Sequence, residues 1–143
     1  RVVLEVAATR LAGSDIEAML PELRDRQRRH SEEGEKVLAL GNEHESVPLQ
    51  LTQDYFQSDN DFHRAVFKHS GNRYLSDMYD SLGALTHRMR QAVVRGPVDV
   101  TEAAAEHLAV VVAFEANDLD GAVEAMRRHI DNVRLRSVAD SSR

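Results

Sequence analysis

Residues 49–72, LQLTQDYFQSDNDFHRAVFKHSGN, carry a pattern that indicates the class of fold. Apolar side chains recur there at helical spacing, and the serine–glycine pair that follows is a typical helix end. The apolar residues are Leu51, Tyr55, Phe56, Phe62, Val66 and Phe67. Asp59 and His63 fall on the same face, four positions apart, so both side chains can bind one ion. The stretch predicts a helix over about residues 49–69 with two polar residues turned towards the core.

The rest of the chain shows the same periodicity, and no stretch alternates in the manner of a β-strand. Further helices are expected over residues 1–12, 14–29, 73–93, 99–114 and 119–136. Residues 30–48 contain glycines and a proline in polar surroundings and are predicted as a connection. The elements predict an all-α fold, an antiparallel bundle of about six helices. The helical domain is expected to span residues 1–136, with a polar tail over residues 137–143.

The composition narrows the class of protein. A chain of 143 residues is long enough for one domain with a sizeable core. It has no cysteine, which excludes a disulfide framework, a thiolate nucleophile and cysteine-bound metal sites. Its net charge of −6 has the wrong sign for a domain that holds a nucleic-acid backbone. No apolar run approaches the ~18 residues of a membrane span and no signal peptide is recognisable, so a soluble, cytoplasmic protein without a membrane partner is expected.

Two further histidines lie on the apolar stripes of predicted helices. His107 falls three residues after Ala104 and four before Val111, and His129 has the same placement in the last helix. Burying an aspartate with three imidazoles is costly unless a partner satisfies them, and a divalent cation does so in one step. The sequence therefore predicts a metal site made of Asp59, His63, His107 and His129. Zinc is the first choice for this donor set, with nickel, manganese or iron as alternatives.

The other four histidines are interpreted as structural residues. His30 and His44 lie in polar stretches, His69 lies at a helix end, and His87 lies off the apolar stripe of its helix. Any one of the three predicted histidine ligands, taken alone, is more simply interpreted as a core histidine, and it is the coincidence of all four residues that favours a metal. A metal-free structural or dimerisation bundle is therefore an alternative reading.

Recognised catalytic motifs are missing from the sequence. It contains no His-Glu-x-x-His, no pair of Glu-x-x-His segments, no Gly-x-Ser-x-Gly and no phosphate-binding glycine loop. The chain is therefore not expected to be an enzyme. A small metal-dependent hydrolase or isomerase that uses the same four ligands is the second alternative.

Three parts of the sequence carry a resemblance to a known family. The residues from Asp59 to Leu75 are similar to its D-x-x-F-H…s-g-N-x-x-L signature. Residues 106–129 resemble its E-H…A…g-D…A…m…H pattern, and residues 1–12 resemble its R-x-x-L-E opening. The family is that of the C-terminal, ligand-binding FCD domains of FadR-subfamily GntR transcription regulators. The resemblance spans nearly the whole chain.

The resemblance implies a function for these residues. In that family the motif aspartate and three histidines hold a metal at the floor of a bundle cavity, and small organic acids bind beside or onto it. The resemblance thus implies a central metal or ligand cavity in this bundle. Arg1 matches an arginine that faces the effector carboxylate, with the fork geometry that a carboxylate needs. Arg88, beside the inner stripe of its helix, is a second candidate for contacting the anion. A homodimer is also implied, with DNA bound only through an N-terminal winged helix-turn-helix domain that is absent from this chain.

Overall fold

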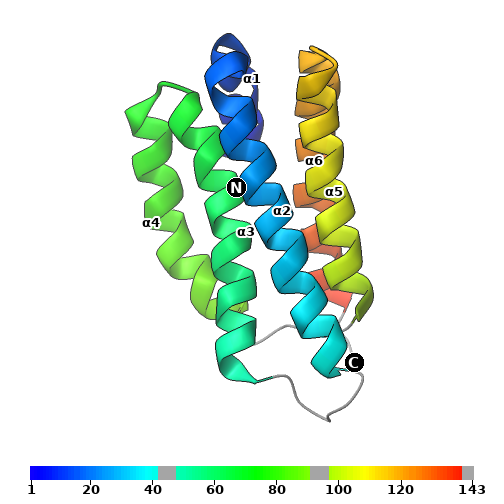
Figure 1. Ribbon diagram of the computed structural model, residues 1–143. Coiled ribbons are helices and arrows are strands. Elements are labelled where there is room, and N and C mark those ends of the chain that lie inside the picture. The colour runs from blue at the N-terminus through cyan, green and yellow to red at the C-terminus, as the bar shows by residue number, and fades with distance from the viewer. Residues whose placement is uncertain (42–47, 91–96, 140–143) are drawn as a thin grey trace.

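The computed structural model describes residues 1–41, 48–90 and 97–139, without the side chains of 41, 84–90, 97–98 and 137–139. These ranges are all-α, as predicted (Figure 1). The helices are α1 (Val2–Ala12), α2 (Ile16–Gly41), α3 (Leu49–His69), α4 (Arg73–Arg90), α5 (Pro97–Glu115) and α6 (Leu119–Ala139), with a 3-10 turn η1 (Gly13–Asp15) between the first two. The predicted start and end of α3 are confirmed.

The prediction of a connection over residues 30–48 is wrong for its first part, because α2 continues to Gly41. His30, Gly34 and Val37 recur at helical spacing and are all buried, so they form the inner stripe of this half of α2. A Cβ atom on Gly34 would lie only 2.8 Å from a side-chain carbon of Val100, so the glycine permits close packing and is not a helix breaker here.

Capping residues explain where two of the helices begin. The Asn72 side chain accepts hydrogen bonds from the backbone N–H groups of Tyr74 and Leu75 and so caps α4. Asn117 adopts a positive φ of 56°, and Asp118 then accepts a hydrogen bond from the Gly121 N–H at the start of α6. These turns reverse the chain and make neighbouring helices antiparallel.

Other helix ends differ slightly from the prediction. α5 begins at Pro97, two residues before its predicted start, because proline is well suited to the first helical position. α6 extends to Ala139 and includes part of the predicted polar tail. The predicted end of α4 lies outside the described residues.

The core is built around α3, which packs against α1, α2 and α4, while α5 packs against α2 and α6. Its largest fully buried apolar side chains are Phe62, Phe67, Phe114, Met19, Leu23 and Met126. A smaller buried group, Val37, Tyr55 and Val100, lies where α2, α3 and α5 meet. Burial of these side chains supplies most of the driving force for folding.

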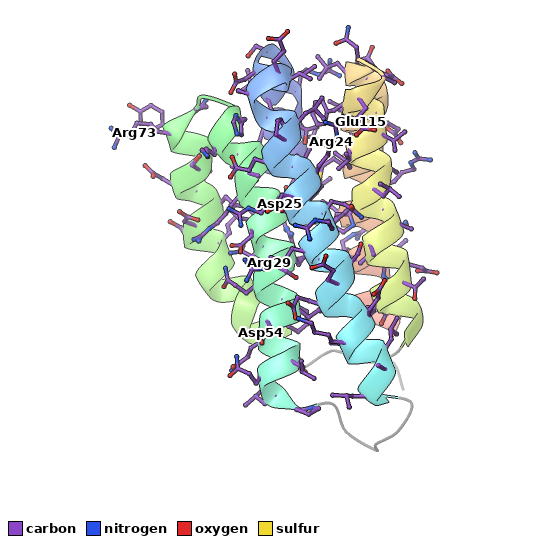
Figure 2. The ribbon with its side chains drawn as sticks, in the orientation of Figure 1. Arg24, Asp25, Arg29, Asp54, Arg73 and Glu115 are labelled. Atoms are coloured by element: carbon purple, nitrogen blue, oxygen red, sulfur yellow. The ribbon has the colours of Figure 1, made fainter. Side chains whose placement is uncertain are left out.

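Charged side chains cover the outside of the bundle (Figure 2). Asp25 and Arg29 on α2 are exposed, and Arg24 forms an ion pair with Glu115 of α5. This charged part of α2 is therefore a solvated face. Among the helices of the described ranges, none has the length and apolar character to cross a lipid bilayer.

Candidate metal centre

The structure brings together the four residues that the sequence predicts as metal ligands. Asp59 and His63 come from α3, His107 from α5 and His129 from α6. The aspartate is 6% exposed and each of the three histidines is 0% exposed. One candidate ligand atom from each residue lies within 4.8 Å of those of the other three. Three helices therefore converge on a buried Asp/His cluster that is consistent with a metal site.

The distances within this cluster suit donors that share one ion. His129 Nε2 lies 3.2 Å from both His107 Nε2 and His63 Nε2. Asp59 Oδ1 lies 3.4 Å from His107 Nε2 and 3.7 Å from His63 Nε2. Two donors at the usual zinc–nitrogen distance of about 2.1 Å are roughly 3.0 to 3.4 Å apart in octahedral or tetrahedral coordination. The donor set and its spacing thus fit a small divalent cation.

Carboxylates outside the cluster fix the orientation of two of the imidazoles. His63 Nδ1 lies 3.0 Å from Glu5 Oε2, and His129 Nδ1 lies 2.8 Å from Glu106 Oε2. A carboxylate only accepts hydrogen bonds, so each Nδ1 carries the donated proton. In the neutral rings the two Nε2 lone pairs then face each other across 3.2 Å. A positive charge between them removes this repulsion, which is the usual arrangement around a metal-bound histidine.

Glu5 connects the cluster to the N-terminus of α1. It is fully buried, accepts a hydrogen bond of 3.0 Å from Arg1 Nε, and contacts His63 with its other oxygen. Burial raises the pKa of Glu5, but the charges and hydrogen bonds of His63 and Arg1 outweigh burial and lower the pKa to about 2. Glu5 is therefore ionised at neutral pH and adds negative charge beside the cluster.

Glu106 accepts a hydrogen bond from His129, as Glu5 does from His63. Arg136 of α6 contacts both Glu106 oxygens, at 2.9 and 3.0 Å, and Asn132 donates a further hydrogen bond of 2.8 Å. Burial raises the pKa of Glu106, but the hydrogen bonds from His129, Arg136 and Asn132 lower it to about 2. This carboxylate is thus held in place from three directions and stays ionised.

The three histidines of the cluster differ in their protonation. Burial lowers the pKa of His107 well below its ordinary value, and the neighbouring imidazoles lower it further. Burial also lowers the pKa of His129, against the opposing effect of Glu106. Burial opposes the charge on His63 too, but Glu5 and Asp59 outweigh it and raise the pKa of His63. Two of the three imidazoles are therefore held in the neutral form that binds metal ions.

Of the two residues predicted to bind the effector, Arg1 lies one side chain away from the cluster, behind Glu5. Its Nη2 is buried and, within the described part of the chain, makes no hydrogen bond. Burial lowers the pKa of Arg1, but Glu5, Tyr79 and Asp59 outweigh it, so the guanidinium stays charged. The predicted role of Arg88 falls on a side chain outside the described residues.

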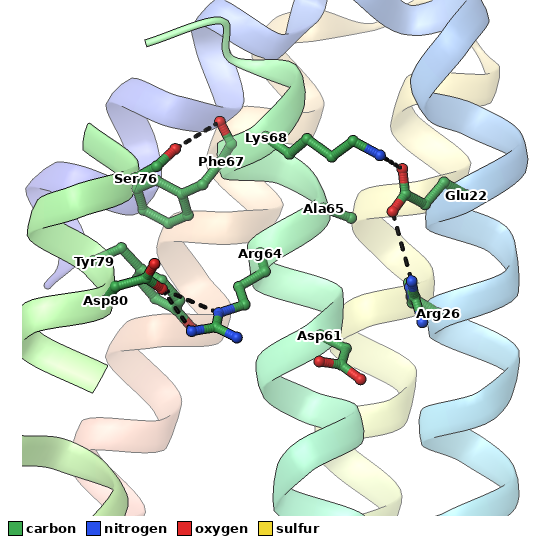
Figure 3. A pocket seen from close by; sticks show the side chains of 10 residues that line it. All are labelled: Glu22, Arg26, Asp61, Arg64, Ala65, Phe67, Lys68, Ser76, Tyr79 and Asp80. Atoms are coloured by element: carbon green, nitrogen blue, oxygen red, sulfur yellow. Dashed lines mark hydrogen bonds and ion pairs between the residues drawn. The ribbon is translucent and has the colours of Figure 1, made fainter. Parts of the chain in front are cut away.

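A hollow of about 390 Å³ lies elsewhere, between α2, α3 and α4 (Figure 3). Its wall contains none of the four candidate ligands; it is lined by Glu22, Arg26, Asp61, Arg64, Ala65, Phe67, Lys68, Ser76, Tyr79 and Asp80. Arg64 pairs with Asp80 at 2.8 Å, and Lys68 pairs with Glu22 at 2.8 Å. Since these cations already have anionic partners, the hollow offers little attraction to a free carboxylate.

The remaining histidines divide into three cases. His69 pairs with Asp15 and Glu22 at the end of α3, which confirms its structural interpretation. The prediction that His30 lies in a polar connection is wrong. Its side chain is 0% exposed and lies on the inner face of α2. Its ring centroid is 4.7 Å from that of His107, and burial lowers its pKa to about 4. His44 and the side chain of His87 lie outside the described residues.

Sequence reasoning missed the two carboxylates that orient the cluster. Glu5 and Glu106 appear in the quoted motifs, but the sequence gives neither a role. Acidic residues are usually exposed, so their burial and their contacts with His63 and His129 could not be inferred from helical periodicity. The one sequence signal for such a role is the position of Glu106, which directly precedes the predicted ligand His107.

Comparison with known families identifies the domain. The family model described as the FCD domain matches residues 1–132. The comparison with curated proteins gives no match. FCD domains are the C-terminal effector-binding domains of GntR-family regulators. Because the match covers almost the entire sequence, the chain belongs to the FCD-domain family.

Proposed function

We propose that this chain is the metal-containing, effector-sensing domain of a FadR-subfamily transcription regulator in the cytoplasm. The observation that supports it best is the convergence of four buried donor atoms from three helices. The proposed metal ligands are Asp59, His63, His107 and His129. Two ionised carboxylates that orient their histidines add to the argument, since such outer contacts are typical of metal sites.

The donor set favours a divalent cation of the first transition series. Imidazole nitrogen suits zinc, nickel and iron, the carboxylate oxygen suits manganese as well, and no sulfur ligand is present to select copper(I). Zinc is the leading choice for three imidazoles and one carboxylate. A bound ion of this kind supplies positive charge that attracts the oxygen atoms of an anionic ligand.

The proposed effector is a small carboxylate, such as a hydroxy acid or a sugar acid. The buried Nη2 of Arg1 is a charged donor without a hydrogen-bond partner among the described residues. Glu5 connects Arg1 to His63, and the proposed anion contacts both the arginine and the metal centre. Arg88 of α4 is proposed as a second contact to the same anion. These contacts require a cavity next to the cluster.

The regulatory step is proposed to act on a homodimer. Tyr74, Met78 and Leu82 follow one another at a spacing of four residues on α4, and all three are exposed. We propose this face as the dimer contact. An effector that binds one arrangement of the dimer more tightly than another shifts the population of the two. DNA binding then belongs to a winged helix-turn-helix domain of the parent protein.

Elemental analysis of protein purified without chelator or added metal tests the metal site. We expect about one equivalent of a divalent metal per chain. A His107→Ala variant should lose the metal, whereas a His69→Ala variant, changed at the structural histidine at the end of α3, should retain it. Failure of the wild-type protein to take up metal even after reconstitution would contradict the proposal and support a metal-free structural bundle.

A thermal-shift screen of small organic acids tests the effector. A carboxylate should raise the melting temperature of the metal-loaded wild type more than that of the metal-free protein. Arg1→Gln should weaken this response while leaving the metal content unchanged. Chelator-sensitive turnover of the acid would instead indicate a metal-dependent hydrolase or isomerase. Against that reading, the nearby carboxylates Glu5 and Glu106 are already engaged by histidine and arginine and are poor candidates for a general base.

A further inference from the structure

We propose that His30 is a positioning residue of the metal centre, with its Nε2 accepting a hydrogen bond from His107 Nδ1–H. The inference rests on the proposed function of the cluster as a metal site. His30 lies on α2, a helix that contributes none of the four candidate ligands, yet it is as deeply buried as they are. It is not part of the quoted family signatures.

The hydrogen bonds around His30 determine which of its nitrogens carries the proton. Ser58 Oγ lies 2.7 Å from the carbonyl oxygen of Tyr55 and donates its single proton there. The same Oγ lies 3.1 Å from His30 Nδ1 and therefore accepts a hydrogen bond from it. The neutral ring of His30 thus has its proton on Nδ1, and Nε2 presents a bare lone pair.

A complementary donor stands on the neighbouring ring. When Nε2 of His107 points into the cluster as a ligand, the proton of its neutral ring is on Nδ1. The buried side-chain nitrogen and oxygen atoms without a hydrogen-bond partner, over the residues that the structure describes, are Arg1 Nη2, His30 Nε2 and His107 Nδ1. The last two are an acceptor and a donor on adjacent rings. Leaving both unpaired in a dry core is costly, so each is the natural partner of the other.

The arrangement of the rings allows this contact. The centroids of His30 and His107 are 4.7 Å apart, and the ring planes are inclined by 42°. Phe62 stacks on His107 with a centroid distance of 4.0 Å and an angle of 9°, which holds the His107 ring in its plane. Tyr55 stacks on the His30 ring at 4.6 Å. The contact requires a rotation of His30 about its second side-chain torsion, which is broad for histidine.

With His30, each of the three imidazoles in the cluster has an acceptor for its Nδ1–H group. His63 and His129 each donate Nδ1–H to a carboxylate, on Glu5 and Glu106 respectively. The contact with His30 gives the third imidazole an acceptor as well, and this acceptor is neutral instead of anionic. A relay from the Tyr55 carbonyl through Ser58 and His30 would then fix the tautomer of His107 that can bind metal.

The test uses zinc binding by three variants of the metal-free protein. His30→Phe keeps a ring of similar size but removes the acceptor, and we expect zinc affinity in a chelator competition to fall about 10- to 100-fold. His30→Gln can accept from His107 and donate to Ser58, so it should recover most of the affinity. Ser58→Ala, which removes only the relay, should cause a smaller loss. Circular dichroism and the melting temperature of the zinc-free proteins check that each variant folds.

A spectroscopic readout separates positioning from packing. In the zinc-loaded wild type, nitrogen-15 NMR should show a slowly exchanging His107 Nδ1–H. In His30→Phe this signal should shift or exchange rapidly, while those of His63 and His129 remain. Unchanged zinc affinity with an unchanged His107 signal would overturn the inference, and so would equal losses in His30→Phe and His30→Gln. If the wild type itself binds no zinc, the proposed function fails as well, and the two failures are thereby distinguished.

Discussion

Two polar regions of this bundle contain similar side chains but differ in how those side chains are paired. In the surface hollow, Arg64 and Asp80 are each about half exposed and form an ion pair with one another. Lys68 and Glu22 form a second ion pair there (Figure 3). In the buried Asp/His cluster, imidazole nitrogens face one another at 3.2 Å. The number of charged side chains in a region is therefore a poor guide to a metal- or ligand-binding site. Buried donor atoms that converge from several helices are the better guide.

The largest effect should follow from removing a ligand in the buried cluster. His129→Ala should abolish stoichiometric metal binding, because it deletes the nitrogen closest to two other donors. The variant should also lack the metal-dependent stabilisation of the wild type, which amounts to roughly 3–4 kcal/mol when the free metal exceeds its Kd by about 100- to 1,000-fold. Calorimetry with and without chelator measures this difference. A variant whose melting temperature still depends on chelator would contradict the assignment.

A smaller effect should follow from neutralising a carboxylate behind the ligands. Glu106→Gln keeps an oxygen acceptor near His129 but removes the charge, and metal affinity should fall about tenfold or more. Glu102→Gln is the matched control, because Glu102 contacts the same Arg136, at 2.9 Å, and, within the part of the chain that the structure describes, no histidine of the cluster. Equal metal affinities of the two variants in a chelator competition would show that the charge of Glu106 is unimportant to the site.

The same carboxylate predicts a pH dependence of the metal-free fold. The pKa of Glu106 is lowered from 4.5 to about 2 in the folded state, so its stabilising contribution is complete above pH 4.5. That contribution should decline as the pH falls from about 4.5 towards 2. Denaturant unfolding at several acidic pH values should show a shallower decline for Glu106→Gln than for the wild type. Parallel curves for the two proteins would contradict the assigned direction.

The smallest effect is expected in the surface hollow. Arg64→Ala breaks an ion pair whose side chains are 52% and 53% exposed, and exposed pairs contribute about 0–1 kcal/mol. The free energy of unfolding should change by no more than that, and metal content should not change at all. Loss of metal from this variant, measured by elemental analysis, would mean that the two polar regions are coupled.

Sequence periodicity predicted the parts of the fold in which one face of a helix is apolar. α3 has the predicted bounds, and the metal-ligand candidates were found because Asp59 and His63 interrupt its apolar stripe. The second half of α2 was missed since its stripe consists of a histidine, a glycine and a valine. Gly34 is ambiguous in sequence, and its role depends on the approach of Val100 from a distant helix.

The outer part of the candidate site could not be predicted for a related reason. Glu5, Glu106 and His30 lie on three different helices, and each acts through a contact with a residue far away in the sequence. Such contacts depend on how helices are placed against one another. Helical periodicity describes the face of one helix at a time and does not contain this information.

X-ray absorption spectroscopy of the zinc-reconstituted protein tests the central claim most directly. The account predicts one zinc ion per chain, with imidazole and carboxylate donors at about 2.0–2.2 Å in the wild type. The three-imidazole signature should be lost in His129→Ala and kept in His69→Ala. A wild-type spectrum without bound imidazoles, or one that His129→Ala leaves unchanged, would contradict the assignment of the buried cluster as a metal centre.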